Sequence, residues 1–199
     1  MFQISQCVMS IFDPLLSTGS GSCISSTKLC VPDGTCDHSS FGDTAFEDGG
    51  VIPDKYTQAA GPTAPSPALS WSQVPMGTQS FVLLMHDPEP VLNKGSKMDI
   101  THWLIWNIPG TSTGLPEGVA QGELADGSRQ VSLRSNAYMG PGAPAGPYHH
   151  YTFELYALDI KLDVPQGAPQ QAAATRTAVF DAMDGHVLGK AVLVARFHR

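Results

Sequence analysis

The sequence predicts a mainly β domain with antiparallel sheets and one or two short helices. Two observations indicate this. The 199 residues include 20 glycines and 16 prolines, which interrupt the chain too often for a helix bundle or a coiled coil. Three stretches, 80–87, 102–109 and 149–159, carry strong strand patterns. The length fits one domain, or one domain with an appendage, and is sufficient to bury a sizeable core.

Residues 80–87 (SFVLLMHD) form a nearly continuous apolar run, which is typical of a buried strand. The two-residue repeat of a strand places Asp87 on the face of Phe81 and Leu83. A carboxylate at the end of an apolar face is costly unless it is paired or opens into a cavity. Asp87 is therefore a candidate site residue, and the alternative is an aspartate that caps a turn before Pro88.

Residues 102–109 (HWLIWNIP) are rich in aromatic and β-branched side chains and end at a proline, so they predict a second strand. His102 opens this strand. The two-residue repeat places it on the face that holds Leu104, Trp106 and Ile108.

Residues 149–159 (HHYTFELYALD) alternate, with Tyr151 and Phe153 on one face. His149 opens the strand on that same face. A histidine at a strand end is usually a hydrogen-bonded structural residue. Two histidines and Asp87 at the ends of three strong strands instead favour a shared polar site.

The stretch 170–188 carries the one good helical pattern, with Ala178 and Met183 in its apolar stripe and Gly185 as its stop. A strand pattern returns at 190–198. About forty residues with shorter strand pieces separate the second and third strong strands, and so long a loop is usually functional or flexible. The predicted core contains Phe81, Leu83, Trp103 or Trp106, Phe153 and Leu155.

The first 42 residues read as a Gly/Ser-rich extension, which leaves 43–199 as the folded domain. All four cysteines, Cys7, Cys23, Cys30 and Cys36, lie in the extension. Two local disulfides would account for them, with three connectivities. Reduced thiols in a cytosolic protein and a zinc site are the alternatives, although no C-x2-C pair is present.

The net charge of −7 argues against a broad nucleic-acid-binding face. No apolar run is long enough to predict a transmembrane helix, and the N-terminus lacks the basic start of a signal peptide. We therefore expect a cytoplasmic protein, or a secreted one if the cysteines form disulfides.

Residues 138–147 (YMGPGAPAGP) are the most unusual stretch. Their glycines and prolines predict a rigid loop with little side-chain bulk, whose exposed N–H groups could bind an anion. The loop lacks the Lys-Ser/Thr of a P-loop, so nucleotide hydrolysis is not expected. The alternative is a stiff connector. The histidines and Asp87 form no local ligand motif, so no metal site is expected.

Several motifs together resemble the phosphatidylethanolamine-binding protein family, which includes the Raf kinase inhibitor proteins, and most closely its bacterial and archaeal branch. In chain order they are FEDGGVIPDKYT, SPALSW, DPEP, THWLIWNIP, LPEG and NAYMGPGAPAGPYHHYTFELYALD. The resemblance covers about three quarters of the chain. It implies an antiparallel Greek-key β-sandwich with short C-terminal helices.

The resemblance also implies a small pocket at one end of the sandwich that accepts phosphate-like anions and phospholipid head groups. Glu89 stands where relatives carry an aspartate, and Ala143-Pro144 stands where relatives often carry two prolines. The implied ligand-binding residues are Asp87, Glu89, His102, Tyr138, Gly140, Gly142, Pro144, His149 and Tyr151.

The function expected from the resemblance is a binding or regulatory protein that needs no cofactor. Its partners would be a small anionic ligand or phospholipid head group and a protein such as a kinase or protease, and a homodimer is compatible with it. The alternative is a biosynthetic isomerase or cyclase that uses Asp87, His102 and His149 for acid–base catalysis. A third reading, suggested by the extension, is a secreted interaction module.

Overall fold

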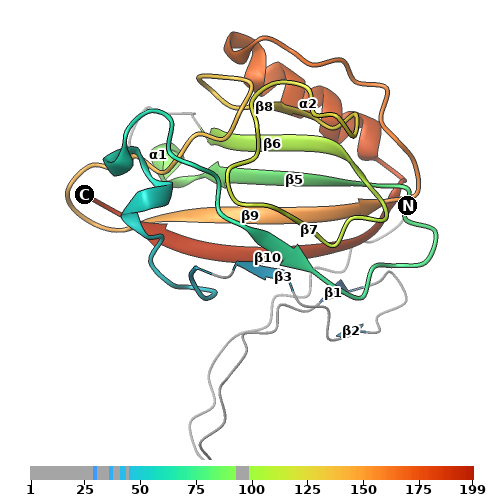
Figure 1. Ribbon diagram of the computed structural model, residues 1–199, viewed down its shortest axis with the longest axis horizontal. Coiled ribbons are helices and arrows are strands. Elements are labelled where there is room, and N and C mark those ends of the chain that lie inside the picture. Colours follow the sequence, from blue (N-terminus) through green and yellow to red (C-terminus); the bar gives the residue numbers. More distant parts are fainter. Residues whose placement is uncertain (1–28, 31–35, 38–40, 44, 93–98) are drawn as a thin grey trace, which may run out of the picture.

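The computed structural model describes residues 29–30, 36–37, 41–43, 45–92 and 99–199 (Figure 1). Within these ranges, seven strands form the larger sheet in the order β2 (Cys36–Asp37), β1 (Leu29–Cys30), β10 (Val187–Phe197), β9 (His149–Leu158), β5 (Ser80–Asp87), β6 (Ile100–Pro109) and β8 (Arg129–Val131). The smaller sheet has the order β3 (Phe41–Asp43), β4 (Leu69–Trp71) and β7 (Gly114–Leu115). The described helices are η1 (Asp54–Tyr56), η2 (Gln58–Ala60), α1 (Glu89–Leu92), η3 (Pro169–Gln171) and α2 (Ala172–Met183).

The strand pairs of both sheets are antiparallel, and their connections form a Greek key. Strands β5, β6 and β8 lie in this order across the larger sheet, with β7 of the smaller sheet between β6 and β8 along the chain, and β9 then returns to lie beside β5. The mainly β, antiparallel fold class is thus confirmed. No helix in the described part of the chain is long and apolar enough to cross a bilayer.

Both faces of the larger sheet are covered. Leu83 and Met85 pack in a cluster shared with the smaller sheet, whereas Val82 and Leu84 pack in a second cluster that includes residues of α2. Two covered faces explain why strand β5 reads as a continuous apolar run. The predicted core residues are all buried, with at most 4% of their surface exposed: Phe81, Leu83, Trp103, Trp106, Phe153 and Leu155.

Helix α2 lies inside the predicted stretch 170–188 and buries Thr175, Val179 and Met183, at the spacing of one helical face. The backbone of Gly185 has φ +77° just beyond the helix, as a glycine stop requires. Ala178, which was expected in the apolar stripe, is exposed. That prediction was wrong because the buried stripe runs through its neighbour Val179.

The N-terminal segment contributes to both sheets. Strand β1 pairs with β10 through Cys30 and Lys190, and β3, which crosses the predicted boundary between residues 42 and 43, pairs with β4. The register of β1 and β2 sets the backbone of Cys30 opposite that of Cys36. Cys7 and Cys23 lie outside the described residues.

Strand β6 carries two irregularities that shift its side chains from one face to the other. Its pairing with β5 skips His102 between Thr101 and Trp103, and skips Asn107 between Trp106 and Ile108. An extra residue of this kind is a β-bulge, which bends a strand and re-aims the side chains beside it. His102 and Ile108 therefore do not share the face of Leu104 and Trp106, contrary to the prediction.

Candidate functional site

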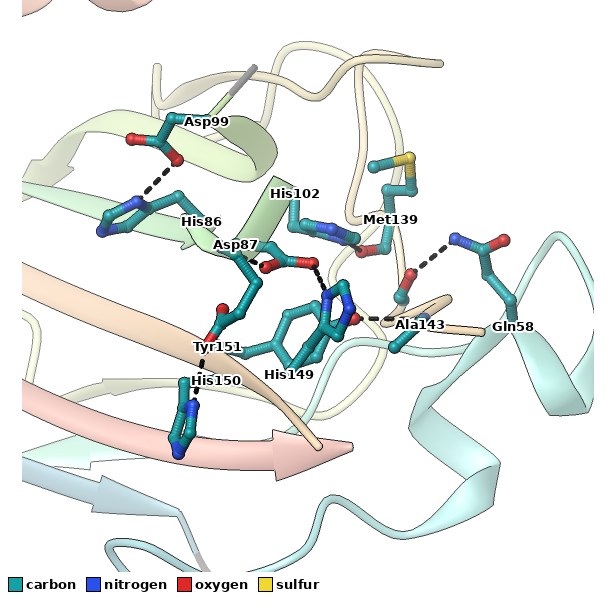
Figure 2. A network of polar contacts seen from close by, with 12 residues as sticks. Gln58, His86, Asp87, Asp99, His102, Met139, Ala143, His149, His150 and Tyr151 are labelled. Atoms are coloured by element: carbon teal, nitrogen blue, oxygen red, sulfur yellow. Dashed lines mark hydrogen bonds and ion pairs between the residues drawn. The ribbon is translucent and has the colours of Figure 1, made fainter. Parts of the chain in front are cut away.

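Three neighbouring strands of the larger sheet bring polar side chains to one end. Asp87 ends β5, His102 lies near the start of β6, and His149 begins β9. Because β5 is antiparallel to both neighbours, these ends meet. These three side chains, which Figure 2 shows close together, border a cavity of about 310 Å³. Its lining comprises Gln58, Asp87, Pro90, Ile100, His102, Leu133, Arg134, Met139, Gly142, Ala143, Pro144, His149 and Tyr151.

Asp87 and His149 form the central pair of this site. The distance from Nδ1 of His149 to Oδ2 of Asp87 is 2.8 Å, and only 4% of the Asp87 side chain is exposed. Burial raises the pKa of the Asp87 carboxyl, and the nearby Glu89 carboxyl adds to this, whereas the contact with His149 acts in the opposite direction. Since Nδ1 is engaged, Nε2 is the nitrogen of His149 left to meet a ligand.

His102 enters the cavity because of the bulge in β6. Its Nδ1 lies 2.8 Å from the carbonyl oxygen of Met139, and its ring meets the ring of Tyr151 edge to face, with centroids 5.1 Å apart. The carbonyl can only accept, so Nδ1 carries the proton. Burial lowers the pKa of His102 to about 4. His102 is therefore neutral at pH 7 and donates to the loop instead of pairing with Asp87.

Tyr151 connects the loop of residues 138–147, called the Gly/Pro loop below, to strand β9. Its hydroxyl oxygen accepts a hydrogen bond of 3.2 Å from the backbone N–H of Ala143. Burial and the carboxylate of Asp87 raise the pKa of Tyr151, so this hydroxyl stays protonated. One N–H group that the sequence suggested for an anion is thus already used within the protein.

The loop is also fixed from the side of η1 and η2. The hydroxyl of Tyr138 donates to the carbonyl oxygen of Tyr56 at 2.8 Å, and Nε2 of Gln58 donates to the carbonyl oxygen of Gly140 at 2.9 Å. A Cβ on Gly140 would lie 2.6 Å from that same Tyr56 oxygen. The close backbone approach therefore requires glycine at this position.

Six of the nine residues implied by the resemblance line the cavity: Asp87, His102, Gly142, Pro144, His149 and Tyr151. Tyr138 and Gly140 instead line a second cavity of about 420 Å³, which shares Gln58, Arg134 and Met139 with the first. Glu89 is absent from both linings, and its Oε1 lies 2.6 Å from Nδ1 of His150.

Sequence reasoning missed two polar side chains of the lining, Gln58 and Arg134. Arg134 is the one lysine or arginine that lines the cavity among the described residues. Nη1 of Arg134 donates a hydrogen bond of 3.2 Å to Oε1 of Gln58, across 76 positions of sequence. Neither residue stands in a recognisable motif or a strand pattern, so no signal in the sequence could have found them.

The family model described as phosphatidylethanolamine-binding protein matches residues 42–198. The chain belongs to this family. Over 158 residues it is 44% identical to a UPF0098 protein of Methanothermobacter thermautotrophicus, and the match covers 78% of this chain and 95% of the relative. This likeness places it with the bacterial and archaeal members.

Solved structures agree with the family assignment. A phosphatidylethanolamine-binding protein homologue from Chlamydia trachomatis superposes with a TM-score of 0.65 at 30% identity, over 80% of this chain and 96% of that one. YbcL of Escherichia coli, at 23% identity, shares the fold with a TM-score of 0.64, over 80% of this chain and 97% of its own. All residues that line the cavity fall inside the part of the chain that matches the phosphatidylethanolamine-binding protein family.

Proposed function

We propose that this protein binds a small anion, a phosphate or the phosphoryl group of a phospholipid head group, in the cavity beside Asp87 and His149. One observation carries the proposal. A single cavity collects the pair of buried Asp87 and half-buried His149, the guanidinium of Arg134 and the rigid Gly/Pro loop from segments far apart in the sequence. Membership of the phosphatidylethanolamine-binding protein family supports it.

Recognition would rest on directed hydrogen bonds. Arg134 offers a planar set of N–H donors that suits phosphate oxygens, and Nε2 of His149 faces the same space. His102 is neutral and held by Met139, so it shapes the wall and adds no charge. A local donor set of this kind fits a protein whose net charge is −7.

The size of the cavity limits the ligand. Pockets that bind small molecules usually span about 300 to 1,000 Å³, and a cavity of about 310 Å³ lies at the lower end of that range. Such a volume suits phosphate or phosphoethanolamine and leaves no room for acyl chains. Any lipid tail would lie outside the cavity.

Calorimetric titration in metal-stripped buffer tests the proposal with two probes, inorganic phosphate and phosphoethanolamine. Arg134→Gln and His149→Ala should each weaken binding about tenfold or more, the cost of one charge-assisted hydrogen bond. Lys161→Gln is the matched control. Lys161 is exposed and follows the far end of β9, so its loss removes the same charge away from the cavity.

Equal binding by the wild type and Arg134→Gln, or equal weakening by Lys161→Gln, would refute the assignment. Preference for phosphoethanolamine over phosphate would indicate a head group as the source of the anion, and equal affinity would indicate a free phosphate. The protein partner of the kinase or protease class, the homodimer and the cytoplasmic location stay predictions.

A further inference from the structure

Asp87 and His149 have a third ionisable neighbour that the anion site does not use. One side-chain atom each of Asp87, Glu89 and His149 lies within 4.8 Å of the other two. The set combines two carboxylates with one imidazole, and it is assembled from the end of β5, the start of α1 and the start of β9. Since His149 is 60 positions beyond Glu89, no local motif could have predicted it.

Hydrogen bonds from a backbone N–H and from the side chain of His150 orient the two carboxylates. Oδ1 of Asp87 accepts the backbone N–H of Glu89 at 3.0 Å, and Oε1 of Glu89 lies 2.6 Å from Nδ1 of His150. Partners of this kind hold the ligands of protein metal sites in place. The arrangement therefore has an oriented outer layer, with His150 behind Glu89.

The other oxygen of Glu89 has no such partner. Oε2 of Glu89 is buried and makes no hydrogen bond with any described residue. A buried carboxylate oxygen without a partner costs free energy, and the facing carboxyl of Asp87 adds like-charge repulsion when both are ionised. A cation between the two carboxylates would satisfy Oε2 and remove the repulsion.

We propose that Asp87, Glu89 and His149 bind a divalent cation through two carboxylate oxygens and one imidazole nitrogen. A mixed nitrogen and oxygen set suits first-row ions such as Mn²⁺, Fe²⁺ or Zn²⁺ better than Ca²⁺ or Mg²⁺. Ligands about 2.1 Å from a common ion lie at most about 4.2 Å apart. Since the three ligand atoms already lie within 4.8 Å of one another, small rotations of the side chains are enough to bring them around one ion.

Three protein ligands leave the remaining coordination positions to water or to an anion. Asp87 and His149 both line the 310 Å³ cavity, so the ion would be reached from it. The ion would then place positive charge beside a bound anion and offset the negative charge of Asp87 and Glu89. This role of the ion rests on the proposed function. The cation site itself does not depend on the anion.

Manganese is the appropriate probe for the full-length protein. The four cysteines would compete for Zn²⁺, whereas Mn²⁺ prefers carboxylate and imidazole ligands to thiolates. Titration of Mn²⁺ in phosphate-free buffer, followed by the loss of the free-ion electron paramagnetic resonance signal, should show a single saturable site. Glu89→Gln keeps the shape of the side chain and should weaken Mn²⁺ binding about tenfold or more. Asp87→Asn should have the same effect, as the second carboxylate ligand.

A matched control comes from the pair His186 and Asp159, whose Nδ1 and Oδ1 atoms are 2.9 Å apart on the surface. This pair has the same chemistry as His149 and Asp87 but belongs to no described three-ligand group. Asp159→Asn should therefore bind Mn²⁺ as the wild type does. Absence of a saturable site, unchanged binding by Glu89→Gln, or equal weakening by Asp159→Asn would overturn the proposal. Because the anion titration is run without metal and this one without phosphate, failure of either leaves the other intact.

Discussion

Arg134 and Gln58 form a bridge between two cavities: Nη1 of Arg134 donates to Oε1 of Gln58 at 3.2 Å, and both residues line the 310 Å³ and the 420 Å³ spaces. Gln58 uses its other amide atom, Nε2, to hold the carbonyl oxygen of Gly140 (Figure 2). The side chain of Gln58 thus positions both the Gly/Pro loop and the guanidinium of Arg134 at the candidate site.

The first prediction follows from this double role. Gln58→Glu places a carboxylate beside Arg134, so the guanidinium would form an ion pair inside the protein and become less available to an anion. We expect phosphate affinity to fall about tenfold, and to fall less in Gln58→Ala, which removes the hydrogen bond without adding charge. Calorimetric titration of the two variants measures the difference. A Gln58→Glu protein that binds phosphate as tightly as Gln58→Ala would contradict this role of Arg134.

The second prediction concerns pH and His102. Burial lowers the pKa of His102 in the folded protein to about 4, although hydrogen bonds to the backbone of Met139 and Gly140 act in the opposite direction, against 6.5 in an unfolded chain. As pH falls below 6.5, His102 becomes protonated in the unfolded chain but stays neutral in the folded protein. The contribution of His102 to the free energy of unfolding is therefore complete above pH 6.5. It is lost as pH falls towards 4, by about 3 kcal/mol in total.

Urea unfolding at a series of pH values between 7 and 4 tests this predicted loss of stability from His102. His102→Asn retains a donor for the carbonyl oxygen of Met139 but cannot titrate, so its free energy of unfolding should decline less steeply than that of the wild type. Parallel curves for the two proteins would show that His102 is not the residue responsible.

The third prediction compares two glycines of the same loop. A Cβ on Gly140 would lie 2.6 Å from the backbone oxygen of Tyr56 and 2.9 Å from Cα of Thr57, whereas the three atoms nearest to a Cβ on Gly142 all belong to the side chain of Gln58. The backbone of Tyr56 and Thr57 cannot move away from an added Cβ as easily as the side chain of Gln58 can. Gly140→Ala should therefore lower the free energy of unfolding by about 1–3 kcal/mol, and Gly142→Ala by less. Denaturant melts of both variants decide, and the reverse order would show that η1 yields to the loop.

The fourth prediction concerns the N-terminal segment. Strands β1 and β2 lie at the edge of the larger sheet and reach it through the pairing of Cys30 with Lys190, while the family match begins at residue 42. A chain that begins at Ser40 should therefore still unfold in one cooperative transition. Thermal unfolding followed by circular dichroism measures this. Loss of cooperativity would make the edge strands part of the folding unit.

The fold was predictable from the sequence because its signals are local. The alternation in β9 and the apolar run in β5 each depend on a few neighbouring residues, and both strands form where expected. The helix was found for the same reason. The orientation of His102 was not predictable, since a bulge depends on how β6 pairs with β5 and not on β6 alone.

Strand patterns alone predicted the site only where it coincides with strand ends, and the family resemblance added Gly142, Pro144 and Tyr151. Asp87 and His149 were identified because polar residues at the end of apolar strands are conspicuous. Gln58 and Arg134 lie in segments without a repeating pattern, and they meet only after the loop has packed on η1 and η2. The closeness of Glu89 to His149 likewise depends on the antiparallel pairing of β5 and β9.

The antiparallel order β9, β5, β6 also divides the site into a part carried by strands and a part carried by a loop, which we expect to differ in their tolerance of substitution. The floor, Asp87, His102 and His149, is carried by β5, β6 and β9, which have neighbouring strands on both sides, so we expect the amide protons in the middle of these strands to exchange slowest in the molecule. The rim, from Leu133 to Pro144, is loop. Substitutions in the rim can therefore alter which ligand enters without disturbing the strands that carry Asp87, His102 and His149. Engineering of new ligand preferences is best started in the rim.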